Sequence, residues 1–301
     1  MAQRKDLDPN ADKRLKRLAV ALAVIISAIL VLIKAFAWFD TGSVSILGAL
    51  VDSFIDVAAS LVNMWAIFYA LKPADYEHRF GHGKAEALAG LLQSIFVGGS
   101  AVYLCVEVAK RLFNPQPIVN ADFGIIVIII SMVLTLVLVI FQRYVIRRTS
   151  SVAISADSMH YTSDLMVNLG VIATLLLASQ MDVHILDPII ALAITAYVIY
   201  TGWKILKRSF DLLMDHEFRP HDRTAIINLA MKHPEVVAVH ELRTRSSGIL
   251  SFVQLHLEMD GTHTLFRAHQ IADEVEAEII KHYPETDVII HQDPAGLNES
   301  H

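Results

Sequence analysis

Residues 44–71 read VSILGALVDSFIDVAASLVNMWAIFYAL, and residues 152–180 read VAISADSMHYTSDLMVNLGVIATLLLASQ. Both stretches are long and apolar enough to span a membrane, which takes roughly 18 residues or more. Each nevertheless contains a pair of ionisable side chains four positions apart, Asp52 with Asp56 and His160 with Asp164. An Asp at the centre of a spanning helix costs ~2.5–3.5 kcal/mol, so several together indicate a polar cavity or a bound cation.

The spacing of these pairs places both members on one helix face. Two such faces turned toward each other offer three carboxylates and one imidazole, enough for a four-ligand cation site. The alternative is an ion pair that only packs the helices, or a span that ends before the acids. Further polar residues favour a hydrated interface between the two stretches, namely Ser60, Asn63, Ser163 and Asn168.

The composition is that of a multispanning α-helical membrane protein. Of 301 residues, 54% are hydrophobic and only 19% are charged, against about 25% charged in average soluble domains. Six spans are expected, near 16–39, 44–71, 86–113, 122–146, 152–180 and 186–208. Lys and Arg concentrate before the first span and in the second–third and fourth–fifth connections, so both termini are predicted to be cytoplasmic. The first apolar run is too long for a cleavable signal peptide, and a second span follows at once.

The last third of the chain has a different character. Residues 211–301 hold 16 acidic against 7 basic residues, a net charge of −9, and 10 of the 14 histidines. Periodicity predicts a short helix at 220–232, strands at 236–245 and 250–259, an amphipathic helix from 265 to 279 and a strand at 288–291. The predicted organisation is a cytoplasmic segment 1–15, a transmembrane domain 16–210 and a soluble αββαβ domain 211–301. So small an α+β domain favours dimerisation.

Two more clusters of potential metal ligands stand out. Asp75, His78 and His82 lie in the second–third connection, a set suited to zinc but equally typical of a solvated loop. The tail offers His240, His256, His269, His291 and Asp293, which could bind one ion, or two if the carboxylate bridges. Scattered surface histidines are the alternative, because convergence depends on strand order. The other seven histidines are expected to be ordinary. The single Cys105 leaves no disulfide or thiolate site.

Together these motifs strongly resemble the cation diffusion facilitator family, and within it the bacterial zinc and iron efflux proteins. The resemblance covers essentially the whole chain. It rests on six spans, Asp-x-x-x-Asp in the second, His-x-x-x-Asp in the fifth, a tail of metallochaperone-like αββαβ order, and the stretches 43–47 SVSIL, 80–86 FGHGKAE, 240–245 HELRTR and 289–294 IIHQDP.

The resemblance implies a role for each matching residue, and every ligand position is filled. Asp52, Asp56, His160 and Asp164 match the family's tetrahedral transport site, and Asp75, His78 and His82 its loop site. His240, His256, His269, His291 and Asp293 match the cytoplasmic two-metal site, with Asp293 as the bridge. Lys84 and Asp215 match a charged interlock between protomers.

The expected function is proton-coupled export of divalent cations by a homodimer in a bacterial inner membrane. Protons and metal compete for the same ligands, and His160 is the most pH-sensitive of them. One nitrogen and three oxygen ligands suit Zn²⁺, with Cd²⁺ as a competitor and Fe²⁺ left open. No nucleic-acid partner is expected. A membrane metalloenzyme would need a motif such as His-Glu-x-x-His, which the sequence lacks, and a sensor without transport would not need the buried quartet.

Overall fold

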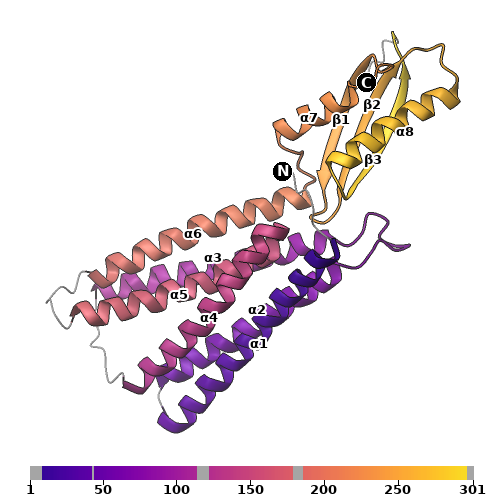
Figure 1. Ribbon diagram of the computed structural model, residues 1–301. Coiled ribbons are helices and arrows are strands. Elements are labelled where there is room, and N and C mark those ends of the chain that lie inside the picture. The colour runs from indigo at the N-terminus through magenta and orange to yellow at the C-terminus, as the bar shows by residue number, and fades with distance from the viewer. Residues whose placement is uncertain (1–8, 43, 114–121, 179–185, 297–301) are drawn as a thin grey trace. The chain divides into compact units, whose positions relative to one another are not determined.

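The computed structural model describes residues 9–42, 44–113, 122–178 and 186–296 (Figure 1). These residues form two compact units. We call residues 9–71 and 85–210 the helical unit, and residues 72–84 with 211–296 the tail unit. The connections between the predicted spans at 114–121 and 181–185, together with His184 and His301, lie outside the described residues.

The helical unit is built from six long helices, α1 Pro9–Thr41, α2 Val44–Ala70, α3 Lys84–Phe113, α4 Asp122–Thr149, α5 Val152–Ala178 and α6 Leu186–Leu213. Stretches of α1 to α4 are by themselves long and apolar enough to cross a membrane. The first helix begins at Pro9 rather than at 16, because the helix continues into polar residues beyond the apolar run. Large apolar side chains on the outer surface of the helical unit, such as Phe36 of α1 and Trp65 of α2, are mostly exposed, as a lipid-facing surface requires.

The core of this unit lies where α1, α4 and α5 meet. Ile26 and Leu30 of α1, Leu138 of α4 and Tyr161 of α5 are buried together. A second cluster joins α3, α5 and α6 through Val97, Met159 and Val198. Because α2 also packs against α1 and α5, Asp56 of α2 and His160 of α5 come to lie partly buried inside the unit.

A buried ion pair ties three of these helices together at one end. Lys16 of α1 donates to Glu86 of α3 at 2.8 Å, and both side chains are almost fully buried. The other oxygen of Glu86 accepts the backbone N–H of Val152 at 2.8 Å. A carboxylate that binds a free N–H at the first turn stabilises a helix start. Glu86 therefore fixes the beginning of α5 relative to α1 and α3.

The tail unit is a three-stranded sheet covered on one face by two helices (Figure 1). The elements follow in the order α7 Pro220–Ala230, β1 Ala238–Ser246, β2 Ser251–Met259, α8 Leu265–His282 and β3 Thr286–Pro294, so the predicted αββαβ order is confirmed. β1 pairs with β2 antiparallel, and β2 pairs with β3 in parallel. The third strand is longer than predicted, because it pairs with β2 along its whole length.

The alternation of strand side chains decides which residues face solvent. On β2, Val253, Leu255 and Leu257 point into the core under α7 and α8, so Gln254 and His256 point to the opposite face. That open face carries the histidines considered below.

Candidate metal centres

The first cluster joins α2 to α5 inside the helical unit. His160 Nε2 lies 2.8 Å from Asp56 Oδ1 and 3.7 Å from Asp164 Oδ2. One ligand atom of each of the three side chains lies within 4.8 Å of the others. All three are partly buried, so an imidazole and two carboxylates converge in a largely apolar surrounding.

Asp52 does not join this cluster in the structure. It lies one turn before Asp56 on α2, and its side chain is exposed. The structure therefore brings together three of the four side chains predicted for this site, and the role of Asp52 stays a prediction. The sequence reasoning missed a cation nearby: Lys34 of α1 donates to Ser53 Oγ at 2.6 Å and to the Ala49 carbonyl at 3.2 Å. The sequence feature that could have indicated this cation is a charged Lys inside the apolar run 16–39.

The second cluster lies in the 72–84 loop of the tail unit. His78 Nδ1 lies 3.3 Å from Asp75 Oδ1, and His82 Nε2 lies 3.2 Å from Asp75 Oδ2. The two rings are 4.5 Å apart between centroids. The backbone N–H of His78 donates to Asp75 at 2.7 Å, and this bond lowers the pKa of the carboxyl below its ordinary value. All three predicted side chains thus converge, with Asp75 favoured in the anionic form that a metal ligand needs.

The third cluster is a row of histidines across the open face of the sheet. His240 pairs with His256 in the register of β1 and β2, and His256 pairs with His291 in that of β2 and β3. Next to His240, at Glu241, the backbone adopts a positive φ of 48°, and the register of β1 shifts between His240 and Arg243. Such a bulge redirects neighbouring side chains. The row exists because the strand register places His240 beside His256 across the hairpin of β1 and β2, and brings His291 of β3, which follows α8, beside His256.

Asp293 is the centre of this row. Its Oδ2 lies 2.9 Å from His256 Nδ1 and 3.4 Å from His240 Nε2, while its Oδ1 lies 3.0 Å from His291 Nε2. The carboxylate is almost fully buried beneath the three rings. Each oxygen therefore faces a different part of the row, an arrangement that suits a carboxylate shared by two ions. Glu258, which lies 3.5 Å from His240, is a neighbour that the sequence analysis missed.

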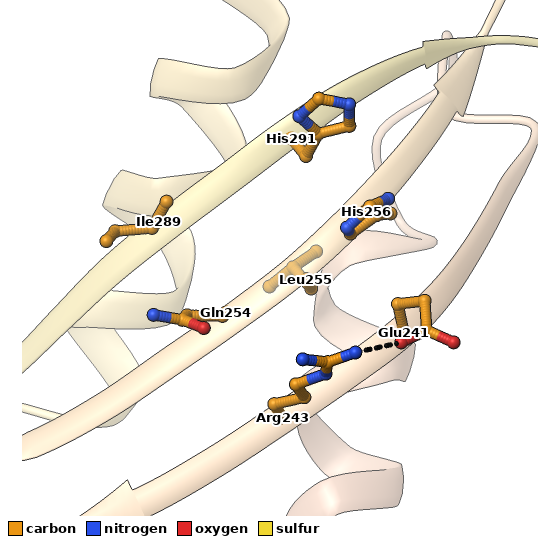
Figure 2. Close-up of a pocket in the computed structure, with 7 residues that line it drawn as sticks. All are labelled: Glu241, Arg243, Gln254, Leu255, His256, Ile289 and His291. Carbon is orange, nitrogen blue, oxygen red and sulfur yellow. Dashed lines mark hydrogen bonds and ion pairs between the residues drawn. The ribbon is translucent and has the colours of Figure 1, made fainter. Parts of the chain in front are cut away.

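His269 lies apart from this row on α8, where it is largely exposed and 3.7 Å from Asp273. Its predicted part in the site stays a prediction. A shallow pocket next to the row is lined by residues of all three strands, with His256 and His291 on one side and the Arg243–Glu241 ion pair, 2.8 Å long, on the other (Figure 2).

Lys84 and Asp215, the predicted interlock, contact each other within one chain. Lys84 Nζ lies 2.9 Å from Asp215 Oδ1, and Arg245 lies 3.6 Å from the same oxygen. Asp215 has a positive φ of 53°. The pair links the 72–84 loop to the chain that follows α6, within the tail unit.

Two protein-family models match this chain. A model of the cation efflux transmembrane domain matches residues 20–214, and one of the cation efflux protein cytoplasmic domain matches residues 218–295. The chain belongs to the cation efflux family. The resemblance inferred from the motifs is thereby confirmed.

Relatives of this cation efflux protein are similar over nearly their whole length. The cation-efflux pump FieF of Yersinia enterocolitica is 44% identical over 291 residues, which cover 97% of this chain and 96% of that protein. The FieF pump of Klebsiella pneumoniae is 46% identical over the same shares. This cation efflux protein is accordingly a transporter and not an enzyme.

Solved structures are also similar to a part of this chain. The zinc form of CzrB, a putative zinc transporter, is 27% identical, covers 29% of this chain and 99% of that one, and has a TM-score of 0.27. The metal-bound C-terminal domain of the CzcD transporter from Thermotoga maritima is 27% identical, covers 27% of this chain and 100% of that one, and has a TM-score of 0.26.

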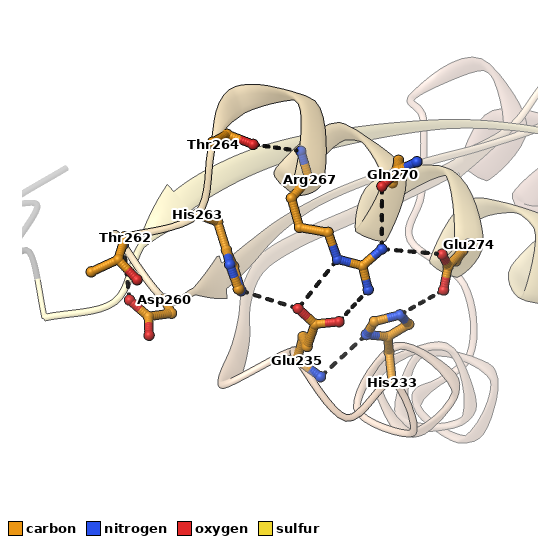
Figure 3. Close-up of polar contacts among 9 residues, drawn as sticks. All are labelled: His233, Glu235, Asp260, Thr262, His263, Thr264, Arg267, Gln270 and Glu274. Carbon is orange, nitrogen blue, oxygen red and sulfur yellow. Dashed lines mark hydrogen bonds and ion pairs between the residues drawn. The ribbon is translucent and has the colours of Figure 1, made fainter.

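Two histidines expected to be ordinary belong to a charged cluster in the tail unit (Figure 3). Glu235, before β1, forms an ion pair with Arg267 of α8 and lies 3.3 Å from His263. His233 lies 2.9 Å from Glu274 of α8. We call these five residues the α8 clasp. It joins the α7–β1 connection to α8, and pairs of this kind give no sequence signal because the partners are about 30 or more residues apart.

Proposed function

We propose that this cation efflux protein exports divalent metal ions from the cytoplasm in exchange for protons, with Zn²⁺ as the preferred ion. The observation that carries the proposal is the convergence of Asp56, His160 and Asp164 inside the helical unit. Three ionisable ligands in an apolar surrounding need a cation or protons to offset their charge. The metal ion and the protons bind to the same ligand atoms. An ion that binds from one side of the membrane is therefore released when protons arrive from the other side.

One imidazole with two or three carboxylates is a donor set that suits Zn²⁺. It also admits Cd²⁺ and Fe²⁺, which are the alternative substrates. Asp52 would complete a four-ligand site if α2 turned so that its exposed carboxylate joined Asp56. Movement of the helices that carry the site is the general route to alternating access in transporters.

The tail unit is proposed to bind zinc ions that remain with the protein. The donor sets fit, since the loop cluster supplies two imidazoles and a carboxylate, and the sheet cluster supplies three imidazoles around the two oxygens of Asp293. Bound zinc supplies positive charge that offsets the acidic tail. Asp75, His78 and His82 would hold one ion, and Asp293 with His240, His256 and His291 would hold the others.

The open face of the sheet is the proposed contact between two copies of the chain. It carries Ile289 and His291, both exposed, and the matched tail domain is the dimerisation domain of its family. Lys84 and Asp215 are proposed to stabilise this dimer, and His269 to add a ligand. The proposed setting is a bacterial inner membrane, with segment 1–15 and domain 211–301 cytoplasmic and domain 16–210 in the bilayer.

The test is metal flux in proteoliposomes that contain a zinc-sensitive dye and carry a pH gradient. We expect Zn²⁺ movement that depends on the gradient and is abolished in Asp164→Ala. Intact movement in that variant would reject the antiport mechanism. Loss of tail metal without loss of flux would instead show that the tail sites are structural.

A further inference from the structure

Arg245, near the end of β1, joins three segments of the tail unit. Its guanidinium carbon lies 4.6 Å from the centre of the Phe80 ring in the 72–84 loop and 4.5 Å from that of Phe252 on β2. A cation this close to an aromatic ring is attracted to its face. One nitrogen of Arg245 also lies 3.6 Å from Asp215, which follows α6. A single side chain therefore contacts the loop, the hairpin of β1 and β2, and the chain after α6.

The strand register explains why Arg245 and Phe252 meet. The two residues are paired across β1 and β2, so their side chains lie next to each other on one face of the sheet. Alternation along β2 assigns Phe252 to the open face, together with His256. Phe252 is nevertheless only 6% exposed, because Arg245 and the ring of Phe80, 5.4 Å away and edge to face, lie against it.

Phe80 lies in the middle of the loop metal cluster. It follows His78 by two residues and precedes His82 by two residues. His82 is buried, whereas Asp75 and His78 are exposed. The contact that holds the Phe80 ring on the sheet therefore also restrains the two imidazoles on either side of it, whose ring centroids lie 4.5 Å apart.

The backbone of the loop follows the hairpin closely on both sides of His82. A Cβ at Gly81, where φ is +77°, would meet Leu250 at 3.8 Å. A Cβ at Gly83 would overlap the carbonyl oxygen of Ser247. Both contacts are to the turn between β1 and β2, so the loop cluster is assembled against this turn.

We propose that Arg245 is a positioning residue for the loop metal site, which it holds through Phe80, and that zinc at this site in turn orders the β1–β2 hairpin. Such coupling is reciprocal. If the hairpin favours the arrangement in which Asp75, His78 and His82 converge, zinc held by these residues stabilises the hairpin contact by the same factor. The inference rests on the proposed function only in taking the loop cluster as a zinc site.

The first test measures zinc affinity by calorimetry on the full-length protein in detergent. The background variant Asp56→Ala/Asp293→Ala leaves the loop cluster as the site under study. Adding Arg245→Ala is expected to weaken zinc binding about 5-fold or more, the lower end of usual coupling between sites. Arg243→Ala, an exposed Arg on the same strand, is the matched control and should leave the affinity unchanged. Equal affinity with and without Arg245 would overturn the proposal.

A double-mutant cycle tests whether Arg245 acts through Phe80. Phe80→Leu alone should weaken zinc binding as Arg245→Ala does. The variant with both changes should bind zinc about as tightly as the weaker of the two single variants, because residues that act through one contact are not additive. Fully additive effects would show that Arg245 acts by another route and would overturn the proposal.

Hydrogen exchange gives a readout that a merely structural role would not change. In the background protein, zinc should slow the exchange of residues 246–252, and this zinc-dependent protection should be lost in Arg245→Ala at saturating zinc. Protection that persists in Arg245→Ala would overturn the proposal. Residues 271–279 of α8, which lie in the core of the tail unit, check folding. If Arg245→Ala disturbs them, Phe80→Leu, which lies outside the sheet, decides the same comparison.

Asp75→Ala in the same background separates this inference from the proposed function. If Asp75→Ala leaves zinc binding unchanged, the loop is not a zinc site, and both the proposed loop site and the role of Arg245 are rejected. Zinc binding that requires Asp75 but not Arg245 would reject the role of Arg245 alone.

Discussion

His160 Nε2 on α5 lies 2.8 Å from Asp56 Oδ1 on α2, although 104 positions separate the two residues. This contact places an imidazole and a carboxylate from different helices at one point of the apolar interior. An exchange of proton for metal needs such a point, because the group that binds the ion must also be able to bind a proton.

The two acids of α2, Asp52 and Asp56, are expected to matter similarly for transport, although only Asp56 lies in the cluster. Asp56→Asn should lower the initial rate of Zn²⁺ uptake in proteoliposomes by at least about 10–100-fold, since even partners of metal ligands have effects of that size. If α2 brings Asp52 into the site, Asp52→Asn should lower the rate comparably. Asp40→Asn, an exposed acid at the end of α1, is the control. A normal rate in Asp52→Asn would reduce the site to three protein ligands.

Asp293 should control the metal content of the tail. Asp293→Asn replaces one carboxylate oxygen by an amide N–H, which cannot bind an ion, so zinc measured by mass spectrometry should fall. Zinc should also raise the Tm less, because a ligand at 100 times its Kd stabilises the folded state by about 2.7 kcal/mol. Asp287→Asn, exposed on the same strand, is the control. An unchanged zinc content would show that Asp293 is not a ligand.

Glu86 should be the most sensitive acid outside the metal clusters. Glu86→Ala leaves Lys16 buried without its partner and the first N–H of α5 unbound. Removing one member of a buried pair costs ~3–5 kcal/mol, so thermal unfolding in detergent should occur at a clearly lower temperature. Glu77→Ala, on the exposed part of the loop, should unfold like the unchanged protein, and equal stability of the two variants would contradict this account.

The α8 clasp should make the tail less stable in acid. The hydrogen bond from Arg267 lowers the pKa of Glu235 below its ordinary value of 4.5. A lowered pKa stabilises the fold above the unfolded value, and this contribution is lost as the pH falls through the folded value. Glu235→Gln should therefore lower the Tm slightly at neutral pH, and this difference should shrink as the pH falls below the ordinary value of 4.5. Thermal unfolding of the unchanged protein and of Glu235→Gln across this pH range measures the difference in Tm. A difference in Tm that does not change with pH would show that packing, not charge, is responsible.

Gly83 should be required for the position of the 72–84 loop. A Cβ at Gly83 would overlap the backbone carbonyl oxygen of Ser247, whereas one at Gly98 would meet nothing within 4 Å. Gly83→Ala should displace the loop and weaken zinc binding at Asp75, His78 and His82, and Gly98→Ala should not. Zinc titration and hydrogen exchange across residues 72–84 measure the effect. Tight zinc binding in Gly83→Ala would show that the loop tolerates the shift.

The sequence by itself determined the helical spans, the αββαβ order and the identity of the candidate ligands. The length of an apolar run and the spacing of its apolar residues can be read from the local sequence. Ionisable side chains inside such a run are unusual however the helices pack. Spacing along one helix also sufficed to place His160 and Asp164 on one face.

Only the tertiary structure decided which of those residues meet. The convergence of His240, His256 and His291 depends on strand register, and that of Asp56 with His160 on the packing of α2 against α5. The exposure of Asp52, the contact of Lys16 with Glu86 and the contact of Arg245 with Phe80 have the same origin. A sequence records the chemistry of each side chain, but partners far apart in the chain are chosen by packing.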